Sequence, residues 1–262
     1  MSAATLAPSG RVSVVSNTLM IARRNLLHIK ANPEQLVEMT VQPLMFLVLF
    51  VYVFGGAIAG SSREYLQFAL PGILVQGIAF TPFTTAIGLN VDFQRGLIDR
   101  FRSLPIARSA VIGGRILADG ARIVWSTLII TGFGVLLGFR FGGGAMGALG
   151  ALVLVTAFGL AMCWFMAFIG IAARTTESVN TWGFMIILPL TFASSAFARP
   201  ETMPGWLEAF ANVNPVTSVI DASRGLMLGG PVAEPVIKSV IWLAAITAVF
   251  GSLAIARYRR RI

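Results

Sequence analysis

Residues 92–104 combine charged and apolar side chains in a pattern suited to docking rather than to catalysis. The apolar side chains recur at helical spacing along one stripe: Phe93, Leu97, Phe101 and Leu104. The charged ones fall on the other side, where they can pair: Arg95, Asp99 and Arg102. We expect a short amphipathic helix that begins at Asp92 as its N-cap and ends before Pro105, because a proline drives its preceding residue out of the α region. Such a helix between two membrane spans is a docking element.

A second set of polar side chains interrupts the apolar run 66–89. These are the candidate transport path: Gln76, Thr81, Thr84 and Thr85. Pro71 and Pro82 in the same run predict a broken or kinked helix, which is tolerated only where neighbouring groups satisfy the freed carbonyls. The polar side chains could equally be hydrogen-bonding contacts between helices. Acidic groups near the predicted membrane edges favour anchoring over a proton relay: Glu38, Asp119 and Asp221.

The chain offers no pattern for enzyme chemistry. Lys30 and Lys238 lack the glycine of a phosphate-binding loop, so we expect no nucleotide or other cofactor to bind and no catalytic residue. One histidine, His28, and one cysteine, Cys163, cannot supply a usual metal site. The net charge of +9 could suggest nucleic acid, but the basic residues sit at the ends of apolar runs. We therefore expect no nucleic-acid partner.

The elements that must position these residues are membrane helices. Hydrophobic residues make up 56% of the chain and charged residues 12%, about half the charged share of a soluble domain. We predict an all-α fold in one transmembrane domain, 1–262, with a cytosolic tail and an interfacial helix within 1–35. Six apolar runs are long enough to span a bilayer: 36–58, 66–89, 123–138, 149–173, 179–197 and 236–256. The third continues a helix that starts near Ser109.

Residues 198–235 contain two amphipathic pieces that are too short to span. Asn214 and Pro215 form a good N-cap and first-position pair for the second piece. We predict an extracellular re-entrant hairpin that hinges there and closes the transport path from outside. The candidate outer gate is Trp206, Phe210, Asn214, Pro215 and Val216.

The basic residues are distributed unevenly between the two sides of the predicted bundle. Fifteen of the twenty lie on one side: four before residue 33, six within 92–122, Arg174, and four after residue 256. The other five are Arg63, Arg140, Arg199, Arg224 and Lys238. By the positive-inside rule both termini and the docking element are cytosolic, in a multi-pass plasma-membrane protein.

Residues 95–110 and 114–119, in the docking stretch, resemble the signature of type-2 ATP-binding-cassette exporter permeases, most closely the daunorubicin-resistance (DrrB-like) branch. Three further matches follow the family's order: Gln42-Pro43-Leu44, Leu70-Pro71-Gly72, and Asn214-Pro215-Val216 with 222–226 and Gly229. The matches extend over nearly the whole chain. This resemblance implies that 92–105 is the coupling helix that contacts a separate ATPase, with matching positions at Gly96, Asp99, Arg100, Arg102 and Pro105.

The resemblance also implies partners and cargo. Two such permeases pair, as identical copies or paralogues, each on a cytosolic ABC ATPase that binds and hydrolyses ATP, with membrane lipid around them. The expected function is export of hydrophobic or amphipathic molecules: drugs or antibiotics, polyketides or lipids. Two alternatives remain open. One is a permease for a lipid-linked polysaccharide, and the other is a membrane assembly or immunity protein without transport.

Overall fold

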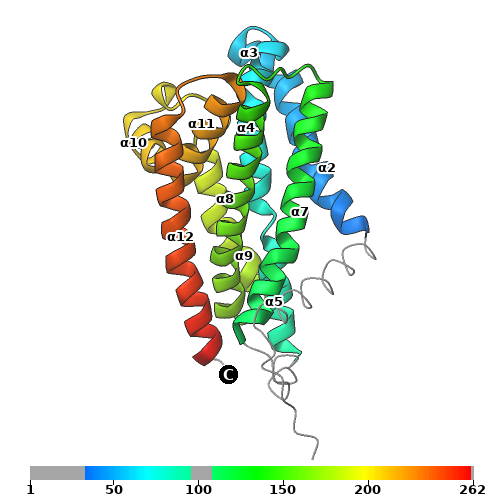
Figure 1. Cartoon of the computed structure of the whole chain (residues 1–262), viewed down its shortest axis with the longest axis vertical. Coiled ribbons are helices and arrows are strands. Elements are labelled where there is room, and N and C mark those ends of the chain that lie inside the picture. The colour runs from blue at the N-terminus through cyan, green and yellow to red at the C-terminus, as the bar shows by residue number, and fades with distance from the viewer. Residues whose placement is uncertain (1–32, 96–107, 261–262) are drawn as a thin grey trace, which may run out of the picture.

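The described chain folds into a bundle of helices whose axes follow one direction (Figure 1). The computed structural model describes residues 33–95 and 108–260, and these contain helices and connections but no strand. The predicted all-α fold is therefore confirmed for these residues. The predicted interfacial helix in 1–35 and most of the predicted coupling helix lie outside them.

The first apolar run forms three consecutive helical pieces. They are α2 (Pro33–Leu49), the π-helix η1 (Phe50–Phe54) and α3 (Gly55–Ala59). The π-helix keeps Phe46, Phe50 and Phe54 in a column, with ring centroids 5.9 Å and 5.3 Å apart. Gly60 adopts the left-handed conformation, φ 75°, and ends α3.

The second run is broken, as its prolines predict. Helix α4 (Ser62–Phe80) passes through Pro71 without ending, and the chain leaves the helix at Thr81 and Pro82. Helix α5 (Phe83–Gln94) then continues to the opposite end of the bundle. We call this the α5 end and the other the α3 end (Figure 1).

Four further helices complete the described bundle. Three are long, α7 (Arg108–Leu136), α8 (Gly144–Ala172) and α12 (Ala233–Arg260), and one is shorter, α9 (Thr176–Phe192). The 3-10 turn η2 (Pro200–Thr202) leads into α10 (Gly205–Val213) and α11 (Pro215–Leu228) at the α3 end. The predicted helical start of the third span near Ser109 is confirmed, since α7 runs unbroken from Arg108.

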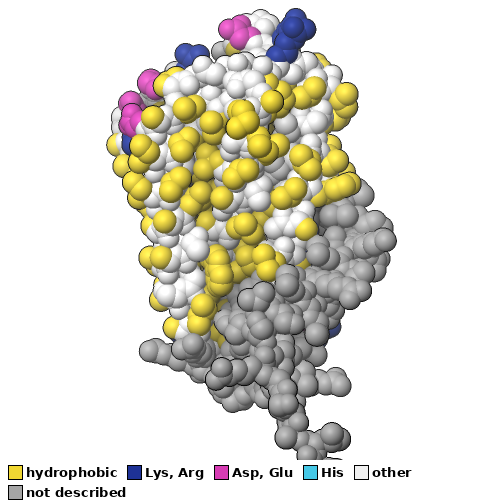
Figure 2. Space-filling model, viewed as in Figure 1, with side chains coloured by type: hydrophobic (Ala, Val, Ile, Leu, Met, Phe, Trp, Pro, Cys, Tyr) yellow, Lys and Arg dark blue, Asp and Glu magenta, His cyan; other side chains and the backbone are white. Residues whose placement is uncertain are grey.

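Five described helical segments are long and apolar enough to cross a membrane. They are Thr40–Ala59, Ser62–Gln94, Gly114–Leu136, Gly144–Ala172 and Ala233–Tyr258. They agree with five of the six predicted spans. Hydrophobic side chains are accordingly spread over the length of the described face in Figure 2, whereas most of the charged ones visible there lie at the α3 end.

The predicted fifth span, 179–197, is longer than its helix. Helix α9 has 17 residues and ends at Phe192, so the prediction that it continues to Phe197 is wrong. The physical reason is that the carbonyl oxygens at the end of α9 accept hydrogen bonds from side chains outside the helix. The Asn214 amide donates to the carbonyl oxygens of Leu190 and Ala193, and the Ser194 hydroxyl donates to that of Thr191.

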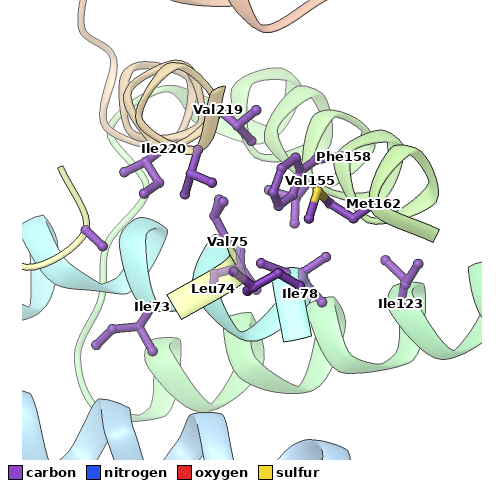
Figure 3. Packing of buried hydrophobic residues seen from close by; sticks show 14 of the residues in the cluster. Ile73, Leu74, Val75, Ile78, Ile123, Val155, Phe158, Met162, Val219 and Ile220 are labelled. Atoms are coloured by element: carbon purple, nitrogen blue, oxygen red, sulfur yellow. The ribbon is translucent and has the colours of Figure 1, made fainter. Parts of the chain in front are cut away.

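The core lies where α4, α8, α7 and α11 meet. Figure 3 shows Leu74 and Ile78 of α4 among side chains from the other three helices. These include Ile123, Val155, Phe158, Met162, Val219 and Ile220. All are buried, so α4 is enclosed while the faces of α2, α9 and α12 keep large apolar side chains exposed.

Glycines allow the backbones around α4 to approach closely. A Cβ at Gly72 would overlap the backbone carbonyl of Ala196, in the segment that follows α9. Small residues at such contacts are the usual means by which membrane helices pack closely.

We predict that Gly72→Ala lowers thermal stability in detergent, because the added methyl group must displace the backbone at Ala196. The expected cost is about 1–3 kcal/mol. Gly56→Ala is the matched control, since Gly56 is also helical and a Cβ there meets nothing within 4 Å. The melting temperatures of the two purified variants decide the matter, and equal values would contradict the close contact.

Candidate functional site

The predicted coupling helix begins within the described residues. Asp92 and Phe93 lie in the last turn of α5, and Arg95 directly follows it. The prediction that Asp92 caps a new helix is wrong, because the backbone N–H of Arg95 still bonds the carbonyl of Val91 and the Asp92 carboxylate pairs with Arg115. The remaining predicted coupling residues lie outside the described residues: Gly96, Leu97, Asp99, Arg100, Phe101, Arg102, Leu104 and Pro105.

Polar side chains join α5, which precedes this segment, to α7, which follows it. We call Thr85, Asp92, Arg115, Asp119 and Arg122 the polar ladder. Arg115 Nη1 lies 2.9 Å from Asp92 Oδ2, and the Thr85 hydroxyl donates to Asp119 Oδ2 at 2.5 Å. Arg122 continues it, 3.0 Å from Asp119 Oδ1. The three ladder residues on α7, Arg115, Asp119 and Arg122, are spaced i, i+4 and i+7, so they share one face of that helix. The ladder thus holds together the two helices that carry the predicted coupling segment.

Gly88 makes room for the Arg115 side chain of the Asp92–Arg115 pair. A Cβ at this position would overlap the Arg115 guanidinium, which passes over α5 to reach Asp92. The rungs differ in burial. The side chains of Asp119 and Arg122 are 3% and 11% exposed, whereas those of Asp92 and Arg115 are 33% and 22% exposed. Removing one partner of the buried Asp119–Arg122 pair should therefore cost more stability than removing one partner of the Asp92–Arg115 pair.

The candidate transport-path residues lie within the packed protomer. Gln76, Thr81 and Thr85 are buried, and Thr84 is half-buried. The hydroxyls of Thr81 and Thr84 donate to the carbonyls of Gly77 and Thr81. These contacts are of the kind that stabilises helix packing at a break. Their role in a transport path stays a prediction.

The five candidate gate residues divide by burial. Trp206 and Phe210 on α10 are 75% and 40% exposed, whereas Asn214 and Val216 are 2% and 1% exposed. Pro215 is half-buried at the first position of α11. The exposed pair can meet lipid or another subunit, but the buried pair belongs to the joint between α10 and α11.

Asn214 forms that joint with both ends of its amide. Its Nδ2 donates to the carbonyls of Leu190 and Ala193 at 2.7 Å and 2.9 Å, and its Oδ1 accepts from the backbone N–H of Val216 at 2.9 Å. One side chain therefore caps the start of α11 and the end of α9. The sequence predicted the N-cap but not the second role.

Arg224 fastens the other half of α11. Its guanidinium donates to the carbonyls of Phe68 and Ser195 at 3.2 Å and 2.7 Å and pairs with Asp221 at 2.9 Å. It also lies 4.0 Å from the centre of the Phe68 ring, a cation–π distance. At the end of the helix, Gly142 and Gly143 each donate a backbone N–H to the carbonyl of Met227 at 3.0 Å. Helix α11 is thus held along its whole length.

The sequence interpretation did not single out Asn90 and Gln94 on α5. Asn90 donates to the carbonyls of Gly170 and Ala173 at the end of α8, and Gln94 donates to the carbonyl of Arg174 in the link beyond it. The available signal was an amide in the last turns of an apolar helix, where a polar group needs a partner. A metal-binding group of three or more acidic, histidine or cysteine side chains is absent from the described part of the chain.

Known proteins match this chain over most of its length. The family model described as ABC-2 type transporter matches residues 16–228. The chain is 39% identical, over 96% of its length and 89% of the relative, to "Daunorubicin resistance ABC transporter permease protein DrrB1" of Streptomyces coeruleorubidus. It is 29% identical, over 94% of its length and 89% of the relative, to "Probable doxorubicin resistance ABC transporter permease protein DrrC" of Mycobacterium tuberculosis. A putative transport permease of Cyanophora paradoxa is 26% identical over 81% of the chain and 74% of the relative.

We predict that Asp119→Ala destabilises the protein more than Asp92→Ala does. The first change removes the carboxylate between Thr85 and Arg122 in a buried site, at a cost of about 3 kcal/mol. The second opens a partly exposed pair worth less than about 1 kcal/mol. The measurement is the melting temperature of each variant in the same detergent. Equal shifts would contradict the ranking by burial.

Proposed function

We infer the function from one premise: the chain belongs to the ABC-2 type transporter family. It is a multi-pass membrane permease, a transport subunit rather than an ATPase. We propose that it exports drugs or antibiotics, in the class of daunorubicin and doxorubicin, from the cell. The observation that carries this is the 39% identity to a daunorubicin-resistance permease across nearly the full length of both chains.

The proposed subunit has six spans in the plasma membrane. Helix α9, with 17 residues, is the proposed fifth span, since it packs beside α8 and α5 within the bundle. The α10–α11 pair is the proposed re-entrant hairpin, because both helices are short, with 9 and 14 residues, and lie at the α3 end. The distribution of basic residues supports a cytosolic α5 end and cytosolic termini.

Transport requires a motor from outside the chain. The family implies an ABC ATPase partner, and we propose that it docks on residues 92–105 at the α5 end. The α5–α7 ladder supports this proposal, because Arg115 and Asp119 tie both flanking helices together and would carry a displacement of the segment into the bundle.

A second permease copy or paralogue, surrounded by lipid, completes the proposed exporter. Exposed large apolar side chains on α2, α7, α9 and α12 are available for the copy and for lipid. On the outer side, Trp206 and Phe210 are the exposed residues of the proposed gate, and Asn214, Pro215 and Val216 fix its joint.

The proposed orientation has a direct test by cysteine labelling in intact cells. We predict that Ser61→Cys, at the turn between α3 and α4, reacts with an impermeant maleimide from outside. Arg174→Cys, between α8 and α9, should react only after the cells are permeabilised. Both native residues are exposed, and the one native cysteine is buried. Labelling of Arg174→Cys in intact cells would reverse the topology.

The proposed motor and cargo are tested in proteoliposomes with the co-purified ATPase and daunorubicin as the probe. We predict that the isolated chain hydrolyses no ATP and that the complex accumulates the probe when ATP is added. Arg100→Glu should abolish this uptake, since loss of one charge that is buried and paired on docking costs about 2–5 kcal/mol. Gly96→Leu should do the same by placing a bulky side chain in the docking segment.

The matched control is Arg63→Glu, an equal charge reversal at the exposed α3 end, which should leave uptake unchanged. Full uptake by both docking variants would remove residues 92–105 from the mechanism. A lack of daunorubicin uptake by the unaltered complex would contradict the proposed cargo.

A further inference from the structure

A break in the helical hydrogen bonding divides α5 from α4. The helix is interrupted at Thr81 and Pro82, where the Thr81 N–H bonds the carbonyl of Ile78 and proline has no N–H to donate. Such a break allows the two pieces to change their relative angle. A displacement at the end of α5 could therefore be absorbed at the break, unless α5 is fastened to another helix.

Asn90 provides such a fastening at the last turn of α8. Its Nδ2 donates to the carbonyl oxygen of Gly170 at 3.0 Å and to that of Ala173 at 2.9 Å. Both hydrogens of the amide are thus used, on carbonyls that a helix end leaves without an intrahelical partner. The side chain is buried, at 1% exposure, so water does not substitute for these bonds.

Gln94 extends the same contact to the link after α8. Its Nε2 donates to Asn90 Oδ1 at 2.8 Å and to the carbonyl of Arg174 at 3.2 Å. The first bond fixes the orientation of the Asn90 amide, because it leaves the nitrogen facing α8. The second reaches Arg174 in the link between α8 and α9, so one chain of hydrogen bonds joins the end of α5 to the end of α8 and to this link.

The backbones of α5 and α8 also touch beside this chain of bonds. A Cβ at Gly170 would overlap the carbonyl oxygen of Ala86. This contact leaves no room for α5 to approach α8 further, whereas the Asn90 bonds prevent it from leaving. The two together fix the distance between the helices.

We propose that Asn90 is a positioning residue of the transport cycle, which locks α5 to the end of α8. This rests on the proposed function, in which the ATPase acts on the segment that follows α5. Displacement of that segment then moves α5 together with the end of α8 and the link to α9. Without the lock, α5 stays joined to α7 by the polar ladder but changes its angle to α8 at Thr81 and Pro82, and ATP is hydrolysed without export.

The first test compares Asn90→Ala and Asn90→Leu in the complex with its ATPase. Leucine nearly preserves the side-chain volume but donates no hydrogen bond, so it separates bonding from packing. We expect both variants to lower the daunorubicin moved per ATP hydrolysed by at least about fivefold, with ATP hydrolysis per folded complex unchanged. Asn180→Ala, at an exposed asparagine of α9, is the matched control and should keep the original ratio.

A purely structural role predicts a different result. Asn90→Ala would then reduce the amount of folded complex while the ratio of transport to hydrolysis in that complex stayed constant. An unchanged ratio in both variants, or a ratio restored by leucine, would overturn the proposal.

The second test needs no cargo. Spin labels on Arg95→Cys and Arg174→Cys report the distance between the end of α5 and the link after α8, with buried Cys163 left in place. With Asn90 present, we expect the same distance with and without nucleotide on the ATPase. With Asn90→Ala, nucleotide should shift or broaden it.

If the distance between the labels responds to nucleotide in the same way with Asn90 and with Asn90→Ala, the proposal is overturned. This measurement also separates the two hypotheses. If the unaltered complex moves no daunorubicin, the proposed cargo fails, and the label distance still decides the role of Asn90.

Discussion

Helix ends inside a bilayer must find partners for their free carbonyls, and this constraint shapes the bundle. Two asparagines meet it in the same way at opposite ends of the molecule. Asn90 donates to the carbonyls of Gly170 and Ala173 at the end of α8, and Asn214 donates to those of Leu190 and Ala193 at the end of α9. In each case the bonded carbonyls are three residues apart, and the donor belongs to another helix. The bonds that complete one helix therefore also join it to a second.

Helix α8 shows how this joining organises the molecule. Its final turn is bound by Asn90 of α5, and its first residues follow Gly142 and Gly143, which donate to the end of α11. Between these ends it packs against α12, α7 and α4 as well. This 29-residue apolar helix is thus held at its end by the Asn90 side chain, beside its start by the bonds of Gly142 and Gly143, and along its sides by close packing. The more exposed α2, α9 and α12 are left to meet what surrounds the protein.

Apolar length and proline positions predicted most of the fold. The break at Thr81 and Pro82 and the N-cap at Asn214 follow from local rules about backbone donors, and the early start of α7 follows from the charged residues that precede its apolar run. The end of α9 and the continuation of α5 through Asp92 could not be predicted in this way. Each depends on a partner more than twenty residues away in the chain, Asn214 in one case and Arg115 in the other. Long-range polar contacts of this kind leave no periodic pattern in the sequence.

The short α9 has a consequence for the lipid around the protein. With 17 residues it is about 25 Å long, whereas the hydrocarbon layer is about 30 Å thick. Its outward side chains include Trp182, Met185 and Leu188, so an apolar band shorter than the layer faces away from the bundle. As the proposed fifth span, α9 would require the lipid beside it to thin, at a fraction of a kcal/mol for each ångström of mismatch. The annular lipid is then uneven around the molecule, and membranes of different thickness would hold the protein with different ease.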